Sequence, residues 1–168
     1  MASTSFHEGK LRTFAQIASI IVRQWHTIND PGIAYNMLTE GLRKLHDNAK
    51  SFRGQGKFKG HAHWSREALE ILSAAENNLS IARASLSHEH VVPVKAVIEK
   101  LVSLGESATP EACAAVVLNY SLVAIITRQE NDRLRQSDIA NKLPEGWEQH
   151  DIWARYKAAG LDTDITST

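Results

Sequence analysis

The stretch LSHEHVVP, residues 86–93, places His88, Glu89 and His90 side by side at the end of an alternating run. Imidazole and carboxylate groups bind divalent metal ions and transfer protons near neutral pH. In an extended strand Glu89 lies on the face opposite to His90, so the chain must bend as it approaches Pro93 if both are to serve one site. The segment therefore predicts a strand end whose side chains bind a metal ion or transfer protons. The alternative is a partly buried His90 that is hydrogen-bonded to the backbone, with Glu89 as a surface carboxylate.

Two asparagines further along the chain have side chains suited to the same site. Asn119 precedes the β-branched run SLVAIIT, and Asn131 lies in RQENDRL, which follows that run. A side-chain amide oxygen is a hard ligand suited to Mg²⁺ or Mn²⁺. Each asparagine also has an ordinary interpretation, as a turn-favouring residue at 119 and as a solvated helix-face residue at 131.

The order of these segments resembles the His-Me finger of the HNH nuclease superfamily, a strand, strand, helix unit that holds one divalent metal ion. The resemblance covers residues 86–134, and its first-strand motif matches EHVVP, residues 89–93. It implies that His90 is the general base, that Glu89 and Asn131 hold the metal, and that Asn119 braces the loop. His88 is an extra ligand or a phosphate contact in this interpretation.

The resemblance implies a Mg²⁺- or Mn²⁺-dependent nuclease that hydrolyses phosphodiester bonds, with DNA as the expected substrate. The chain departs from the family pattern in two respects. It lacks the paired cysteines of many HNH domains, and Asn131 lies 41 positions after His90. Glu130 is therefore an alternative to Asn131 as the second metal ligand.

A basic, glycine-containing segment spans residues 50–64, KSFRGQGKFKGHAHW. Its cations alternate with Phe52 and Phe58, a pattern that suits a phosphate backbone with aromatic rings available for stacking. The predicted nucleic-acid contacts are Arg53, Lys57 and Lys59. A solvated linker is the competing interpretation. His61 and His63 have no acidic or cysteine partner nearby in the sequence, so we expect both to be exposed to solvent.

The elements that must position these residues are mainly α-helical, with a small β element. Apolar residues recur at three- and four-residue steps from Glu8 to about Trp25, and Asp30 with Pro31 starts a second helix. The short connection favours antiparallel packing of the two helices. Their predicted inward faces comprise Leu11, Phe14, Ile17, Ile20, Ile21 and Trp25 in the first helix and Ile33, Met37, Leu38, Leu42 and Leu45 in the second.

Further helices and two strands are predicted in the rest of the chain. Thr127 and Glu130 fit a capping box, so a helix is expected to open at Arg128. The other predicted helices cover residues 65–76, 95–104, 110–118 and 151–159, and the strands cover 86–91 and 121–127. This pattern predicts a helical pair at 1–49, a basic linker at 50–64, and a helical domain at 65–168 that carries a ββα-metal-like finger at 86–136.

Composition narrows the classes of protein to which the chain can belong. Lys plus Arg and Asp plus Glu number 19 each, so the net charge gives no global attraction to nucleic acid. Cys113 is the single cysteine, so an internal disulfide is excluded. We expect this residue to be buried and inert. No run of about 20 apolar residues and no secretory segment is present, so we expect a soluble, cytoplasmic protein without membrane contact.

A non-enzymatic helical interaction protein is the rival to the nuclease. Such a regulator or inhibitor would bind another protein or form a homodimer. It would expose an apolar patch of several hundred Å² on its surface, a size typical of interaction sites. The two hypotheses differ over Glu89, His90 and Asn131, which must converge only in the nuclease.

Overall fold

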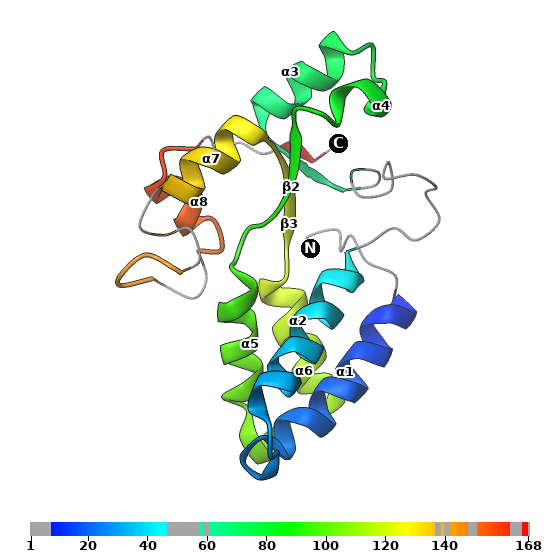
Figure 1. The fold of residues 1–168 in the computed structure, drawn as a ribbon, viewed down its shortest axis with the longest axis vertical. Helices are drawn as coiled ribbons and strands as arrows, with labels where there is room; N and C mark the ends of the chain where they lie inside the picture. The colour runs from blue at the N-terminus through cyan, green and yellow to red at the C-terminus, as the bar shows by residue number, and fades with distance from the viewer. Residues whose placement is uncertain are drawn as a thin grey trace.

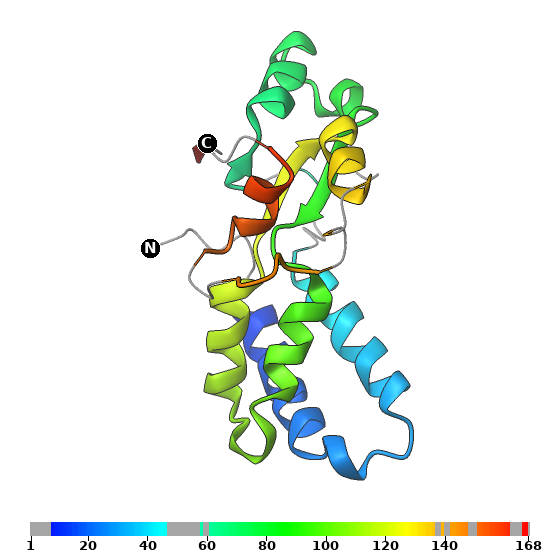
Figure 2. The same ribbon diagram turned by 90° about the vertical axis from the view of Figure 1, so that its left-hand side faces the viewer.

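The computed structural model describes residues 8–46, 58, 61–136, 139, 142–147, 151–161 and 166–167. Along its longest axis the molecule has two parts (Figure 1). A bundle of four helices forms one end, and a small sheet flanked by shorter helices forms the other. Strand β2 leads from the sheet into the bundle, and strand β3 leads back out of it (Figure 2). The fold is mainly α with a small β element, as the sequence predicts.

The bundle consists of α1 (Glu8–Arg23), α2 (Pro31–Leu45), α5 (Val94–Val102) and α6 (Pro110–Tyr120). Short 3₁₀ turns, η1 (Trp25–Thr27) and η3 (Gly105–Ser107), follow α1 and α5. Asp30 caps α2, since its side chain accepts hydrogen bonds from the backbone N–H groups of Gly32 and Ile33. One apolar cluster fills the bundle, with buried residues from all four helices. The N-terminal helical pair therefore shares its core with α5 and α6.

The predicted inward faces of the first two helices are wrong at four positions. Ile17, Ile20, Ile33 and Met37 are exposed, with 47 to 60% of their surface accessible. Helix α1 instead buries Phe14, Ala15, Ala18, Ser19 and Val22. Alanine and serine allow close approach of a neighbouring helix, and α1 packs most extensively against α6. The smaller residues therefore face the bundle, although the larger isoleucines recur at the same helical spacing.

The sheet has the strand order β2-β3-β1-β4. Its main pair is β2 (Leu86–His90), which runs antiparallel to β3 (Val123–Thr127). Strand β1 (His63–Trp64) is parallel to β3, and β4 (Thr166–Ser167) is antiparallel to β1. Every residue of β3 is buried, which explains its continuous β-branched and apolar sequence.

Short helices cover both faces of this sheet. Helices α3 (Arg66–Ala74) and α4 (Leu79–Ala82) pack on the face that contains Leu86 and Ile125. Helices α7 (Arg128–Gln136) and α8 (Ala154–Ala158) pack on the opposite face, which contains Ala124 and Ile126. The two faces of the sheet are therefore two separate environments, and residues that alternate along β2 enter different ones.

Local start signals in this part of the chain are confirmed. The Glu130 N–H donates to Thr127 Oγ1 at 3.0 Å, and the Thr127 N–H donates to Glu130 Oε2 at 2.7 Å. This is the predicted capping box at the start of α7. Ser65 caps α3 through the Ala68 N–H, at the start of the helix predicted over residues 65–76. Cys113 is fully buried in the bundle, as expected. Among the described helices, none has the length and apolar character needed to cross a membrane.

Candidate functional site

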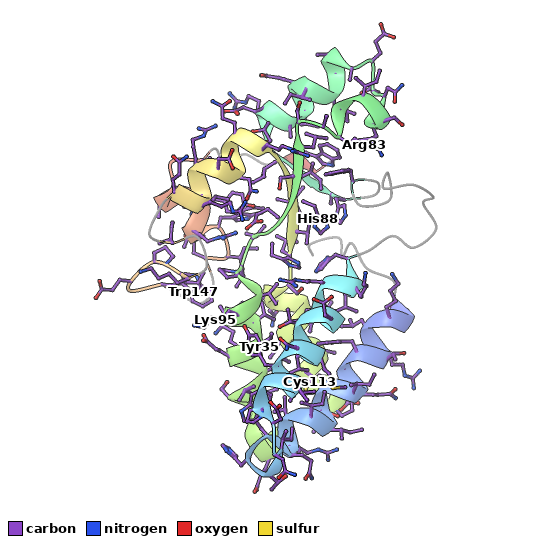
Figure 3. All side chains as sticks on the ribbon, viewed as in Figure 1. Tyr35, Arg83, His88, Lys95, Cys113 and Trp147 are labelled. Atoms are coloured by element: carbon purple, nitrogen blue, oxygen red, sulfur yellow. The ribbon has the colours of Figure 1, made fainter. Side chains whose placement is uncertain are left out.

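Four histidines gather where the end of β2 meets the bundle. His88 and His90 project from β2 toward His46, which follows α2, and His61, which precedes β1. Ring centres lie 5.3 Å apart for His46 and His90, 6.0 Å for His88 and His90, and 4.8 Å for His61 and His88. Figure 3 labels His88 in this group. His90 therefore sits among other imidazoles and not beside a carboxylate.

Two members of this histidine group were not predicted from the sequence. His61 is only 3% exposed, so the expectation that it faces solvent is wrong. His46 is 1% exposed, and its Nε2 lies 2.8 Å from Ser121 Oγ. Both histidines are distant from residues 86–93 in the sequence, and no local pattern links them to that segment. Their position depends on how α2 packs against α5 and on the pairing of β1 with β3, which lies between β1 and β2 in the sheet.

Glu89 points away from this histidine group, toward α8. The Arg155 Nη2 donates to Glu89 Oε1 at 2.6 Å and to the His90 carbonyl oxygen at 2.5 Å. Arg155 is almost completely buried, and the Glu89 side chain is one quarter exposed. A guanidinium that binds both a carboxylate and a backbone carbonyl fixes the end of β2 at a defined position. Arg155 is the residue that holds the predicted site in place.

Glu89 and His90 nevertheless border the same cavity, which has a volume of about 550 Å³. The strand ends at His90, and Pro93 follows before α5 begins, so the backbone bends at the place the sequence indicates. Figure 3 labels Tyr35 and Lys95, which belong to the bundle side of this cavity. The lining residues come from α2, the end of β2, the start of α5 and α8, and are Tyr35, Asn36, Thr39, Glu40, Arg43, Glu89, His90, Pro93, Val94, Lys95 and Arg155.

Positive charge predominates in the lining of the cavity. Arg43, Lys95 and Arg155 contribute cations, against the carboxylates of Glu40 and Glu89. Arg43 forms an ion pair with Glu40 at 2.8 Å, and Lys95 forms one with Glu99 at 3.9 Å. Their side chains are 57% and 65% exposed, so a dissolved anion can reach them and compete with these carboxylates. Guanidinium and ammonium groups of this kind suit an anionic phosphate ligand.

Burial lowers the pKa of His90 well below its ordinary value of 6.5. The positive charges of His46, His88, Arg43 and Arg155 lower this pKa further, in that order. Since a protonated imidazole is disfavoured at this position, His90 is neutral at pH 7. A neutral imidazole at the edge of a cavity is able to accept a proton from water.

The other predicted site residues lie elsewhere. Asn119 is exposed in the last turn of α6 and does not line the cavity. Asn131 lines a different pocket, on the face of α7 that also carries Arg128 and Arg135. Helix α7 buries Glu130 and Leu134, and this packing fixes the direction in which Asn131 points. Arg53, Lys57 and Lys59 lie outside the described residues.

The ligand set expected for Mg²⁺ or Mn²⁺ is not assembled in this arrangement. Glu89 Oε1 is bound by Arg155, His88 is directed to the opposite face of β2, and Asn131 lies in its own pocket. Within the described part of the chain, no group of three or more His, Cys, Asp or Glu side chains is arranged to hold a metal ion. The donor set therefore does not fit the metal that the resemblance implies.

Comparison with protein-family models, with curated proteins and with solved structures found no match to this chain. The geometry of the cavity is thus the basis for a functional proposal.

Proposed function

We propose that the protein is a nuclease that hydrolyses phosphodiester bonds in DNA at the cavity beside the end of β2. The observation that carries the proposal is the placement of His90, whose depressed pKa keeps it neutral, in a cavity that also contains Arg43 and Lys95. Phosphodiester hydrolysis requires a base for water and positive charge for the phosphate oxygens. This cavity contains both kinds of group.

Each residue at the cavity has a role in this proposal. His90 accepts a proton from the attacking water, whose oxygen bonds to phosphorus as the bond to the leaving sugar oxygen breaks, and the leaving oxygen takes a proton from solvent water. Arg43 and Lys95 contact the non-bridging phosphate oxygens from the exposed side. Arg155 positions the strand end through Glu89 and the His90 carbonyl oxygen. Because the expected metal ligands are not assembled, no step is assigned to a metal.

The order of elements gives a second line of support. Strand β2 pairs with β3 along its whole length, and α7 follows β3 directly and contacts both strands. A strand, strand, helix unit with a histidine at the end of its first strand is the arrangement that the resemblance to His-Me finger nucleases implies. Under the proposal this unit presents His90 to the substrate.

Plasmid cleavage tests this function directly. Supercoiled DNA is incubated with the wild-type protein in Mg²⁺, in Mn²⁺ and in chelator, and nicked and linear products are measured. We expect cleavage by the wild type and at least a 100-fold slower rate for His90→Gln, since general-base catalysis contributes about 10² to 10⁴.

His26→Gln is the matched control, because His26 is exposed in η1 and does not line the cavity. It is expected to cleave at the wild-type rate. Cleavage by His90→Gln at the rate of the wild type would remove His90 from the mechanism. Absence of cleavage under all three conditions would contradict the nuclease proposal.

A protein-binding function is the second candidate, and one observation favours it. Ile17 and Ile20 on α1 and Ile33 and Met37 on α2 are large apolar residues that are about half exposed or more. Helices α1 and α2 are neighbours in the bundle, so these residues supply apolar surface of the kind found at interfaces. Light scattering of the wild type and of Ile20→Glu with Met37→Glu tests self-association. A larger mass for the wild type alone would assign this surface to a second copy of the chain.

A further inference from the structure

Helix α7 turns one polar face toward a pocket that is separate from the His90 cavity. Arg128, Asn131, Asp132 and Arg135 recur at intervals of three, four and seven residues, and all four line the pocket. Residues at these intervals share one face of a helix. Glu130 and Leu134, on the other side of α7, are buried against the sheet. The packing of those two residues is what directs the arginine-bearing face outward.

The opposite wall of the pocket adds a third arginine. Arg83, at the end of α4, lines it together with Phe58 and with Ser87 of β2 (Figure 3 labels Arg83). The pocket has a volume of about 550 Å³. Its charged lining comprises three arginines and one carboxylate, that of Asp132. The segments that meet here are distant in the sequence, so the positive pocket is a product of the fold in a chain whose net charge is zero.

The arginines of α7 differ in whether a carboxylate already holds them. Arg133 forms an ion pair with Glu67 at 2.9 Å on another face of the helix. Arg128 and Arg135 are exposed and form no ion pair with any residue in the described ranges. Their guanidinium groups therefore have no carboxylate partner among the described residues, whereas Arg133 already donates to Glu67.

The spacing of the arginines indicates an extended anion. Arg128 and Arg135 are seven residues apart on α7, which is roughly 10 Å along the helix axis. A nucleic-acid strand carries one phosphate about every 3.4 Å of its axis. The pocket is therefore long enough for more than one phosphate. The donors beside the arginines, the Ser87 hydroxyl and the Asn131 amide, belong to the side-chain types that bind backbone phosphates.

We propose that this pocket, lined by Arg83, Arg128 and Arg135, binds the phosphate backbone of DNA outside the cleavage site. DNA as the polymer rests on the proposed function. Ser87 of the pocket and His90 of the cavity are three residues apart on β2, roughly 10 Å. The two side chains lie on opposite faces of the sheet, so the same DNA molecule reaches both sites only by passing around the end of β2. The pocket retains the substrate while His90 acts on it.

Binding measurements without catalysis test this proposal. The anisotropy of a fluorescent 20-base-pair duplex is titrated in chelator at several salt concentrations, with the triple variant Arg83→Gln, Arg128→Gln and Arg135→Gln. We expect Kd at low salt to rise at least 10-fold. Because each phosphate contact contributes about 0.9 to the slope of log K against log salt, the slope is expected to fall by roughly 2 to 3.

Arg133→Gln is the matched control, with the same charge change on the same helix, and it is expected to alter Kd less than 2-fold. Circular dichroism checks that all variants are folded. Equal Kd values and salt slopes for wild type and triple variant would overturn the proposal, as would a wild type that fails to bind the duplex. Displacement of the duplex by an equal concentration of polyglutamate would also overturn it, and would assign the pocket to an acidic protein partner.

The two proposals fail in different ways. His90→Gln is expected to lose cleavage and keep the wild-type Kd. A wild type that binds DNA through the arginines without cleaving it contradicts the nuclease and supports the pocket. A wild type that cleaves DNA while the triple variant binds it equally well supports the nuclease and contradicts the pocket.

Discussion

The helical bundle and the sheet differ in what lies inside them. The core of the bundle is one apolar cluster that includes Leu38, Leu42 and Leu101. The bundle also buries the uncharged polar residues Ser19 and Thr39, whereas the sheet part buries the charged side chains of Glu130 and Arg155. A hydrophobic core is stabilised mainly by the apolar area removed from water, whereas a buried charge is stable only with its partners in place. The bundle therefore serves as a support, and the sheet holds polar groups in defined positions.

Glu130 is an example of a buried charge that is stabilised by its partners. Its Oε2 accepts hydrogen bonds from Ser65 Oγ and from the Thr127 N–H, both at 2.7 Å, and the residue is 2% exposed. These bonds join the starts of α3 and α7 to the end of β3. Helix α7 carries the arginine pocket, so its orientation depends on a buried polar network. Precise placement of charged side chains is what such a network provides.

The largest expected effect in this comparison is the loss of Arg155. Arg155→Met removes a buried guanidinium and leaves Glu89 and the His90 carbonyl oxygen without their donor. Breaking a buried pair in this way costs about 3 to 5 kcal/mol of unfolding free energy. Lys157→Met, which breaks the more exposed pair with Asp151, is expected to cost less than about 1 kcal/mol. Urea denaturation of both variants measures the difference, and equal losses would contradict the positioning role of Arg155.

Truncating a buried apolar side chain in the bundle is expected to cause the next largest loss of unfolding free energy. Leu38 is 1% exposed, so Leu38→Ala removes buried surface and leaves a cavity, at a cost of about 3 kcal/mol. Its neighbour Met37 is 55% exposed, and Met37→Ala should change the unfolding free energy by less than about 0.5 kcal/mol. A large loss for Met37→Ala in denaturant titrations would mean that this face of α2 is covered in solution.

Removal of two helix caps, one in each region, compares the loss of unfolding free energy in the sheet part with that in the bundle. Ser65 caps α3 and also donates to Glu130, whereas Thr109 caps α6 at an exposed position. Loss of a cap costs about 1 kcal/mol, so Thr109→Ala should lose that amount. Ser65→Ala should lose about 1 kcal/mol more, because the buried Glu130 also loses a donor. Equal losses in thermal denaturation would show that the Glu130 network is dispensable.

The smallest expected effect is a dependence of stability on pH. Burial depresses the pKa of His90 in the folded protein, and burial also lowers the pKa of His63. The unfolded chain therefore binds more protons than the folded chain below about pH 6.5. Stability from these two groups is fully present above pH 6.5 and is lost as the pH falls through and below that value. The Tm should fall between pH 7 and pH 5, and His90→Gln should reduce this fall. An unchanged fall in His90→Gln would mean that other groups cause it.

The start signals and the order of elements were predictable because they depend on neighbouring residues. Asp30 with Pro31, Thr109 with Pro110, and Thr127 with Glu130 each begin a helix at the expected place. Capping requires only a side chain and an N–H group two or three residues away. The strand end at His88, Glu89 and His90 was predictable for a similar reason, since alternation and Pro93 are local features.

Only the tertiary structure decided which groups meet. Glu89 and Arg155 are 66 residues apart, and His46 approaches His90 because α2 packs beside α5, which follows β2. The inward face of α1 was set by close packing with α6, which left Ile17 and Ile20 outside. Because Glu130 and Leu134 of α7 are buried, Asn131 lies on the side of the helix that lines the arginine pocket, and not at the expected metal site. Sequence spacing fixes which residues share a face, but the surfaces available for packing determine what each face contacts.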